Sequence, residues 1–195
     1  AQTVRITGQG DLLQDGNIGY TVQITTNSAD GAYNAVDPAD LNFTNVDDDS
    51  VGITVSAGSN LLTSEGGGFS EFDVGLNSQP TNTVEVCLNS TDTSEGIVDI
   101  GNSDAVANVS CGGDAQVTFT TGNWNAAQTV RITGQGDFLQ DGNVGYTVQI
   151  TTISADTAYN AVNPADLNFT NVDDDTVGIT VSAGSNLLTG EGGDF

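Results

Sequence analysis

Carboxylate side chains concentrate in four short segments, and they are the residues whose type and spacing best suit a chemical role. The sequence has 26 Asp and Glu residues, only 2 Lys and Arg and no His, so little positive charge is available to neutralise them. A hard dication would relieve their mutual repulsion, and Ca²⁺ accepts about 6–8 oxygen ligands in irregular geometry. Zinc and copper are poor candidates because His is absent. The segments are LLTSEGGG with Glu65, STDTSEG with Asp92 and Glu95, GQGDFLQDGN with Asp137 and Asp141, and VDDD with Asp173, Asp174 and Asp175.

The elements that would position these acids are β-strands, because apolar and polar residues alternate along most of the chain. Gly, Asn, Asp or Pro bounds each alternating run, and no segment keeps a helical period. The predicted fold class is therefore all-β, with about seven antiparallel strands in a two-sheet sandwich. The runs are centred on residues 51–55, 72–76, 84–88, 117–119, 130–132, 146–150 and 167–169.

The order of these strands predicts that the acidic segments meet. If each strand reverses the direction of the last, the first, third and fifth connections lie at the same end as the tail of the last strand. The four acidic segments are those three connections and that tail. A simpler interpretation is that loop acids are only solvated. Agreement among four segments favours a metal site, since packing like charges together is costly.

The sequence also contains an internal repeat. AQTVRITGQGD begins at Ala1 and again at Ala127, a shift of 126 positions, and residues 1–69 align without a gap on residues 127–195. We place one complete sandwich at residues 51–176. Residues 1–50 are then the C-terminal half of a preceding repeat and residues 177–195 the N-terminal strand of a following one. We expect the chain to be a segment of a longer protein built from tandem repeats.

The same alignment gives a second set of predicted metal ligands. The triplet that ends the complete repeat has a counterpart before it, and Glu65, Asp137 and Asp141 also have counterparts at a shift of 126 positions. Each of these residues is expected to contribute to an equivalent metal site between neighbouring repeats. They are Asp11, Asp15, Asp47, Asp48, Asp49 and Glu191.

The sequence contains two cysteines, and we expect them to form a disulfide. Cys87 lies between Val86 and Leu88, which should point into the core, so Cys87 should point outward. Cys111 lies in the Gly- and Asn-rich segment NVSCGGD. A bond between them would tie this connection to the outer face of the sheet and contribute about 3 kcal/mol. Two free thiols or a two-cysteine metal site are the weaker alternatives.

Several segments resemble the Calx-β-like repeats of giant bacterial surface proteins, a family related to the calcium-binding domains of sodium–calcium exchangers. They include ITVSAGSNLLTSEGG, NWNAAQTVRITG, DGNVGYTVQI, YNAVNPADLNFTN and the closing VDDD. The resemblance implies an immunoglobulin-like sandwich of seven strands that binds calcium at its distal end. It assigns ligand roles to Glu65, Asp137, Asp141 and Asp173–Asp175. Asp92 and Glu95 are further predicted ligands that correspond less closely to the family pattern, because the connection that follows them is longer than in the family.

The net charge and the absence of catalytic motifs exclude several classes of function. The formal net charge of −24 argues against nucleic acid and anionic lipid as partners, and no apolar run is long enough to insert into a membrane. No nucleophile elbow or phosphate loop is present, so we expect no enzymatic activity.

We expect instead a structural repeat of an extracellular stalk, adhesin or filament, stiffened by calcium at its junctions. Its partners would be neighbouring repeats or identical subunits placed end to end, while other parts of the full protein bind any surface glycan or cell-surface ligand. The alternative is an acidic, salt-adapted surface-layer protein, or a carbohydrate- or mineral-binding module, without specific calcium sites.

Overall fold

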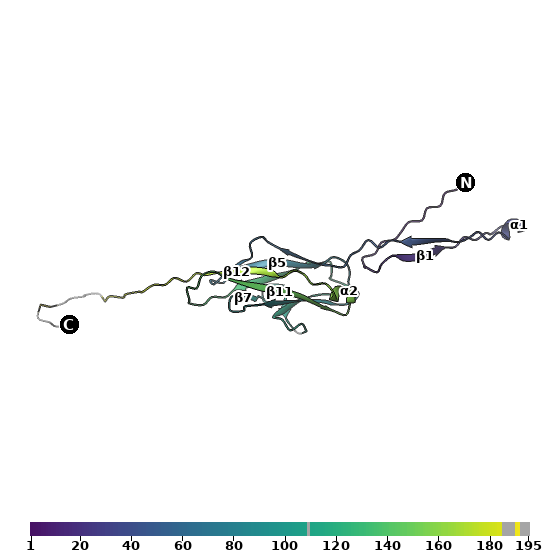
Figure 1. Ribbon diagram of the computed structural model, residues 1–195. Coiled ribbons are helices and arrows are strands. Elements are labelled where there is room, and N and C mark those ends of the chain that lie inside the picture. The colour runs from purple at the N-terminus through teal and green to yellow at the C-terminus, as the bar shows by residue number, and fades with distance from the viewer. Residues whose placement is uncertain (109, 185–189, 192–195) are drawn as a thin grey trace.

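The structure is a computed structural model that describes residues 1–108, 110–184 and 190–191 (Figure 1). The described part contains twelve strands and two single-turn helices. In chain order they are β1 (Ile18–Val22), α1 (Gly31–Asn34), β2 (Leu41–Asn45), β3 (Ile53–Ala57), β4 (Leu62–Ser64), β5 (Phe69–Leu76), β6 (Val84–Ser90), β7 (Gly96–Val98), β8 (Val106–Ala107), β9 (Ala115–Phe119), β10 (Gln128–Gly134), β11 (Val144–Ser154), α2 (Thr157–Asn160) and β12 (Leu167–Val172).

Strands β3 to β12 form a two-sheet sandwich. One sheet has the order β3-β5-β10-β7 and the other β4-β12-β11-β6-β9-β8. The seven strands expected from the sequence are present as β3, β5, β6, β9, β10, β11 and β12, which confirms a β-sandwich. Three short strands, β4, β7 and β8, add to them. The expectation of purely antiparallel pairing is wrong at one place, because β4 pairs with β12 in parallel.

The hydrophobic core lies between the two sheets, and alternation along each strand builds it. Phe72, Val74 and Leu76 of β5 are buried while the residues between them are more exposed. Val86 and Leu88 of β6 face them with no exposed surface. Burying such side chains contributes about 1.5–3 kcal/mol each, so the core is the main source of stability.

A buried tyrosine closes the core at the end where α2 lies. The ring of Tyr159 is fully buried, and its hydroxyl donates to the backbone oxygen of Ser78 at 2.5 Å and accepts from the Ser78 N–H at 3.0 Å. Its counterpart in the N-terminal copy, Tyr33, is 69% exposed. One tyrosine is therefore part of the core, while the other is on the surface.

This difference gives a testable prediction. Tyr159→Phe should lower the free energy of unfolding by about 1–3 kcal/mol, because it leaves buried polar groups of Ser78 without their partner. Tyr33→Phe removes the same hydroxyl from an exposed ring and should change it by less than about 0.5 kcal/mol. Urea denaturation of both variants measures the two values. Equal losses would contradict the role of the Tyr159 hydroxyl.

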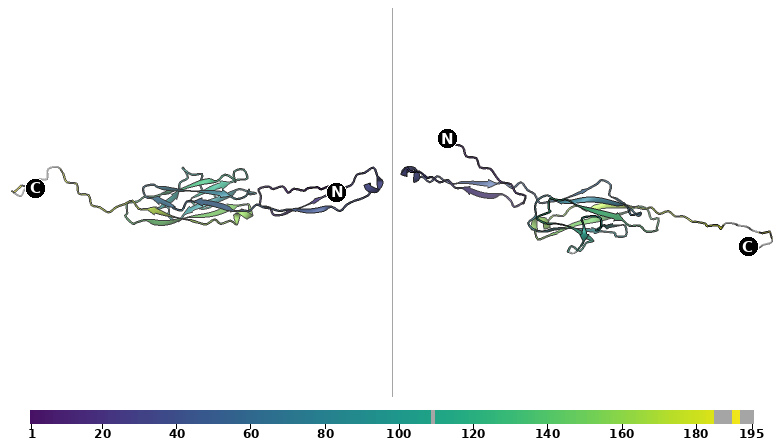
Figure 2. Two further views of the ribbon diagram at one scale, coloured as in Figure 1. Left: turned by 90° about the horizontal axis from the view of Figure 1, so that it is seen from above. Right: turned by 180° about the vertical axis from the view of Figure 1, so that it is seen from behind.

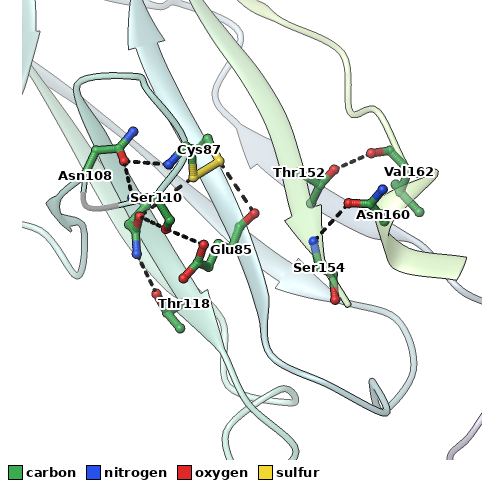
Figure 3. Close-up of a disulfide and its surroundings, with 11 residues drawn as sticks. Glu85, Cys87, Asn108, Ser110, Thr118, Thr152, Ser154, Asn160 and Val162 are labelled. Atoms are coloured by element: carbon green, nitrogen blue, oxygen red, sulfur yellow. Dashed lines mark hydrogen bonds between the residues drawn. A yellow bond between two sulfur atoms is a disulfide. The ribbon is translucent and has the colours of Figure 1, made fainter. Parts of the chain in front are cut away.

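The structure contains the expected disulfide between Cys87 and Cys111, with their Cα atoms 5.8 Å apart (Figure 3). Cys87 lies on β6 between two core residues and outside the core cluster, as expected, yet it is only 3% exposed. The connection that carries Cys111 folds over it, and the Asn108 side chain accepts a 2.7 Å hydrogen bond from the Cys111 N–H. The disulfide thus holds this connection on the outer face of the six-stranded sheet.

The N- and C-terminal segments lie at opposite ends of the sandwich (Figure 2). Strands β1 and β2 form a separate two-stranded hairpin beyond the end that carries α2. The chain leaves the other end after β12 and continues in an extended conformation. Among the described residues, no helix has the length and apolar character required to cross a membrane.

Candidate metal centre

Three segments of the complete repeat meet at the end of the sandwich where the chain leaves β12. The turn after β4 is tied to β12 by a 3.1 Å hydrogen bond from the Glu65 N–H to the Val172 oxygen. The loop after β10 crosses this turn so closely that a Cβ atom on Gly136 would lie 2.4 Å from the Glu65 backbone oxygen. A glycine is required there, and its absence of a side chain lets the two loops approach.

Five carboxylates gather where these segments meet. Oxygen atoms of Glu65, Asp174 and Asp175 lie within 4.8 Å of one another, and so do oxygen atoms of Glu65, Asp141 and Asp173. Glu65 belongs to both groups and links them. We call these five residues the distal acid cluster. Distances of this size allow one cation to contact several carboxylates.

Backbone hydrogen bonds fix the orientation of the cluster. Asp173 accepts from the Gly142 N–H at 2.8 Å and from the Asp175 N–H at 2.8 Å. Gly142 has a φ of +84°, a conformation that glycine adopts without strain. The loop after β10 and the residues after β12 are therefore joined through the side chain of Asp173.

The electrostatics of the cluster are unfavourable without a cation. Partial burial raises the pKa of the Glu65 carboxyl, and the charges of Asp173, Asp137 and Asp175 raise it further, partly offset by a hydrogen bond from the Asp174 N–H. Burial is also the largest cause of the raised pKa of Asp175, followed by the charges of its neighbours. In addition, Asp175 Oδ2 is buried without a hydrogen-bond partner among the described residues.

The donor set fits a hard dication such as calcium. All five side chains offer carboxylate oxygens, and the cluster contains no imidazole or thiolate. A bound dication would satisfy Asp175 Oδ2 and neutralise the charges that raise the two pKa values. The distal acid cluster is therefore a candidate site for a divalent cation.

The other acidic residues predicted as ligands in this repeat do not belong to the distal acid cluster. Asp137 lies close enough to raise the pKa of Glu65 and Asp175, but it belongs to neither group of close oxygens. Asp92 caps its own turn by accepting from Ser94, and this hydrogen bond is the main reason that its pKa is lowered. Glu95 accepts from the Asn171 side chain at 3.2 Å. The connection that opens with Asp92 does reach this end, because the Gln135 N–H donates to the backbone oxygen of Glu95 at 2.9 Å.

The N-terminal copy repeats part of this arrangement. Asp47 accepts from the Gly16 N–H at 2.7 Å and from the Asp49 N–H at 2.9 Å, as Asp173 does in the complete repeat. The pKa of Asp49 is raised by burial first and then by Asp48, Asp47, Asp11 and Asp15. Glu191, the counterpart of Glu65, is exposed near the other end of the described chain.

One residue that supports the site was not anticipated from the sequence. Asn171 is 1% exposed, and its side-chain amide donates to the Gln135 oxygen at 2.8 Å and to Glu95. Its Oδ1 accepts from the Thr63 hydroxyl at 3.0 Å. Asn171 thus connects β4, the loop after β10 and the connection after β6. Asn171 lies in the repeated segment LNFTNVDDD. An asparagine next to a run of acidic residues is usually exposed, so the sequence did not indicate that this side chain would be buried.

Comparisons with known proteins give a distant likeness only. No family model matches the sequence, and no curated protein matches it. Among solved structures, the ASH / PapD-like domain of human CEP192 (PapD-like domain 7) is similar at 14% identity and a TM-score of 0.36. The match covers 64% of this chain and 87% of that chain. Neither a family nor a function follows from it, and the Calx-β resemblance stays a prediction.

Proposed function

We propose that this chain is a structural repeat of an extracellular stalk, adhesin or filament, in which calcium stiffens the junctions between successive sandwiches. The observation that carries the proposal is the position of the distal acid cluster. Asp173–Asp175 directly follow β12, where the chain leaves the sandwich (Figure 1), and among the described residues Asp175 Oδ2 is buried without a hydrogen-bond partner. A cation at this place would act on the direction of the following segment.

The residues of the cluster would perform this task by joining three segments. Glu65 brings the turn after β4, Asp141 the loop after β10, and Asp173–Asp175 the exit of β12. Calcium supplies a positive centre that carboxylates on all three can share. Only Thr176 separates Asp175 from Val177, the first residue of the following copy. Fixing the acids therefore fixes the start of that copy.

The other end of the sandwich provides the complementary half of such a junction. Asp47–Asp49 precede β3 by a few residues, and the Gln79 N–H donates to the Leu12 oxygen at 2.7 Å. The loop that carries Asp11 and Asp15 thus touches the sandwich that follows it. The disulfide is consistent with an oxidising, extracellular environment.

Titration calorimetry on the full chain tests calcium binding. We expect a dissociation constant of roughly 10⁻⁴–10⁻³ M, as for extracellular calcium modules. Glu65→Gln should weaken binding at the distal acid cluster, because Glu65 belongs to both groups of close oxygens. Asp37→Asn is the control, since Asp37 is exposed and belongs to neither acid cluster.

The pH dependence of the same titration provides a second readout. Calcium binds the deprotonated carboxylates, and the pKa values of Glu65 and Asp175 are raised. Protons should therefore compete as the pH falls toward those values, so that affinity is lower at pH 5 than at pH 7.5. Absence of any calcium heat, or an unchanged affinity in Glu65→Gln, would contradict the proposal.

A further inference from the structure

The N-terminal copy exposes apolar side chains that the complete repeat buries. Val4 and Ile6 are 81% and 38% exposed, whereas their counterparts Val130 and Ile132 are fully buried. Tyr20 is 36% exposed and its counterpart Tyr146 only 4%. The local sequences match, so the difference comes from what lies against them.

These exposed side chains line two neighbouring hollows on the hairpin. One, of about 550 Å³, is lined by Ile6, Gly8, Ile18, Tyr20 and Asn45 among others. The second, of about 320 Å³, is lined by Val4, Ile6, Val22, Leu41 and Phe43 among others. Ile6 belongs to both, so the two hollows adjoin. We call residues 2–8 with β1 and β2 the acceptor face.

The complete repeat shows what fills the same place. There β10, the counterpart of residues 2–8, lies between β5 and β7, while β11 pairs with β6 and β12 with β4. All four partner strands come from residues 51–126, which we call the front half. Among the described residues, β1 and β2 of the N-terminal copy pair only with each other, in the same register as β11 and β12. Strand edges left unpaired in this way can bind another strand.

A glycine and an asparagine define the shape of the missing occupant. A Cβ atom on Gly134 would lie 2.3 Å from the Ser64 oxygen and 2.7 Å from the Ser64 nitrogen, both in the β4 backbone. At the counterpart Gly8, a Cβ would meet only the side chain of Asn45. Asn45 donates to the Gln9 oxygen at 2.6 Å, as Asn171 does to Gln135. The acceptor face therefore keeps the space and the polar groups that β4 occupies in the complete repeat.

Charge points to the same occupant. Arg131 makes an ion pair with Glu71 of β5 at 2.7 Å, and its guanidinium lies 3.9 Å from the centre of the Phe69 ring. Its counterpart, Arg5, is exposed on the acceptor face. It is one of only two cations in a chain of net charge −24. A front half would bring a glutamate and a phenylalanine to this arginine.

We propose that the acceptor face binds a second front half, a polypeptide equivalent to residues 51–126, and completes a second sandwich with it. The binding combines strand pairing at the edges of β1 and residues 2–8 with filling of the two hollows by apolar side chains. It requires no metal, so it stands or fails separately from calcium binding.

Hydrogen exchange on the full chain tests the proposal, with an isolated polypeptide of residues 51–126, oxidised at its two cysteines, as the probe. We expect one probe to bind per chain and to slow amide exchange at least tenfold in residues 4–8, β1 and β2. Exchange in β10 should not change, because β10 already has its partners. Gly8→Val should abolish the protection, since its side chain would collide with the backbone of the β4 equivalent.

If the isolated probe aggregates, a single chain in which the probe is covalently joined to the N-terminus tests the same proposal. Residues 51–126 are joined to Ala1, which recreates the Ala126–Ala127 boundary of the complete repeat. We expect the calorimetric enthalpy of unfolding to rise to about twice that of the original chain, since this enthalpy scales with the number of folded residues. An unchanged enthalpy together with unprotected β1 and β2 would overturn the proposal. Self-association of the original chain in which acceptor faces pair with each other, leaving residues 51–126 of both copies in their own sandwiches, would also overturn it.

Discussion

A chain that contains several copies of residues 51–176 is expected to be straight in calcium and bent or flexible after chelation. The distal acid cluster holds five carboxylates next to the exit of β12, and without a cation their repulsion favours separation of the three segments. A cation shared by Glu65, Asp141 and Asp173–Asp175 would instead fix the exit direction. Small-angle scattering should show a longer maximum dimension in calcium than in chelator.

Thermal unfolding of the same samples measures how much calcium binding adds to the free energy of unfolding. A calcium concentration about 100 times the dissociation constant should add about 2.7 kcal/mol to the free energy of unfolding at one site. High sodium screens the repulsion but supplies no directed bonds, so sodium in chelator should not restore the long form. Equal dimensions in calcium, in chelator and in chelator with sodium would favour the salt-adapted alternative.

Replacing Gly134 by valine is the second change for which we expect a large effect. Any Cβ atom at this position would lie 2.3 Å from the Ser64 oxygen and 2.5 Å from Asn171 Oδ1. The nearest atom belongs to the β4 backbone, which cannot move without loosening its pairing with β12. We expect a loss of about 3 kcal/mol or more in the free energy of unfolding, at the upper end for overpacked sites. Urea denaturation monitored by Trp124 fluorescence measures it.

Gly8→Val is the matched control for this prediction. Gly8 occupies the equivalent position in the same local sequence, and a Cβ there would meet only the movable side chain of Asn45. The stability of the sandwich should therefore change by less than about 0.5 kcal/mol. A loss at Gly8 as large as the loss at Gly134 would show that glycine matters for local conformation and not for the approach of β4.

The strands could be predicted because alternation is a local property. The run Val84, Val86 and Leu88 predicted one buried face, and all three side chains have no exposed surface in β6. The parallel pairing of β4 with β12 could not be predicted in the same way. It joins Leu62 to Thr170, more than a hundred residues apart, and depends on how the two sheets close at one end.

The repeat shows directly where local sequence ceases to decide structure. At residues 127–134 the segment AQTVRITG contains β10, which lies between two partner strands, but the same sequence forms no strand at residues 1–8. The hydrophobic pattern is identical, so the difference is one of partners. A strand needs hydrogen bonds from neighbours as well as a suitable pattern.

The candidate site was predictable to a similar extent. Strand order brought the acidic segments to one end, as expected, because the direction of successive strands follows from short connections. Strand order alone could not predict which carboxylates would lie close to one another. Asp92 is held in its own turn by Ser94, and Glu95 is held by Asn171, so neither joins the close groups. Such choices depend on side-chain hydrogen bonds that carry no signal in the sequence.

The disulfide has a consequence for a protein under mechanical tension. Cys87 and Cys111 are separated by 24 positions, and their bond survives when the strands are pulled apart. The intervening residues therefore do not add to the length that an unfolding sandwich releases. At about 3.4 Å per extended residue, the bond withholds roughly 80 Å of chain from each complete repeat. A fibre built from such units would yield in shorter steps under force and would keep its ends closer together while a sandwich is open.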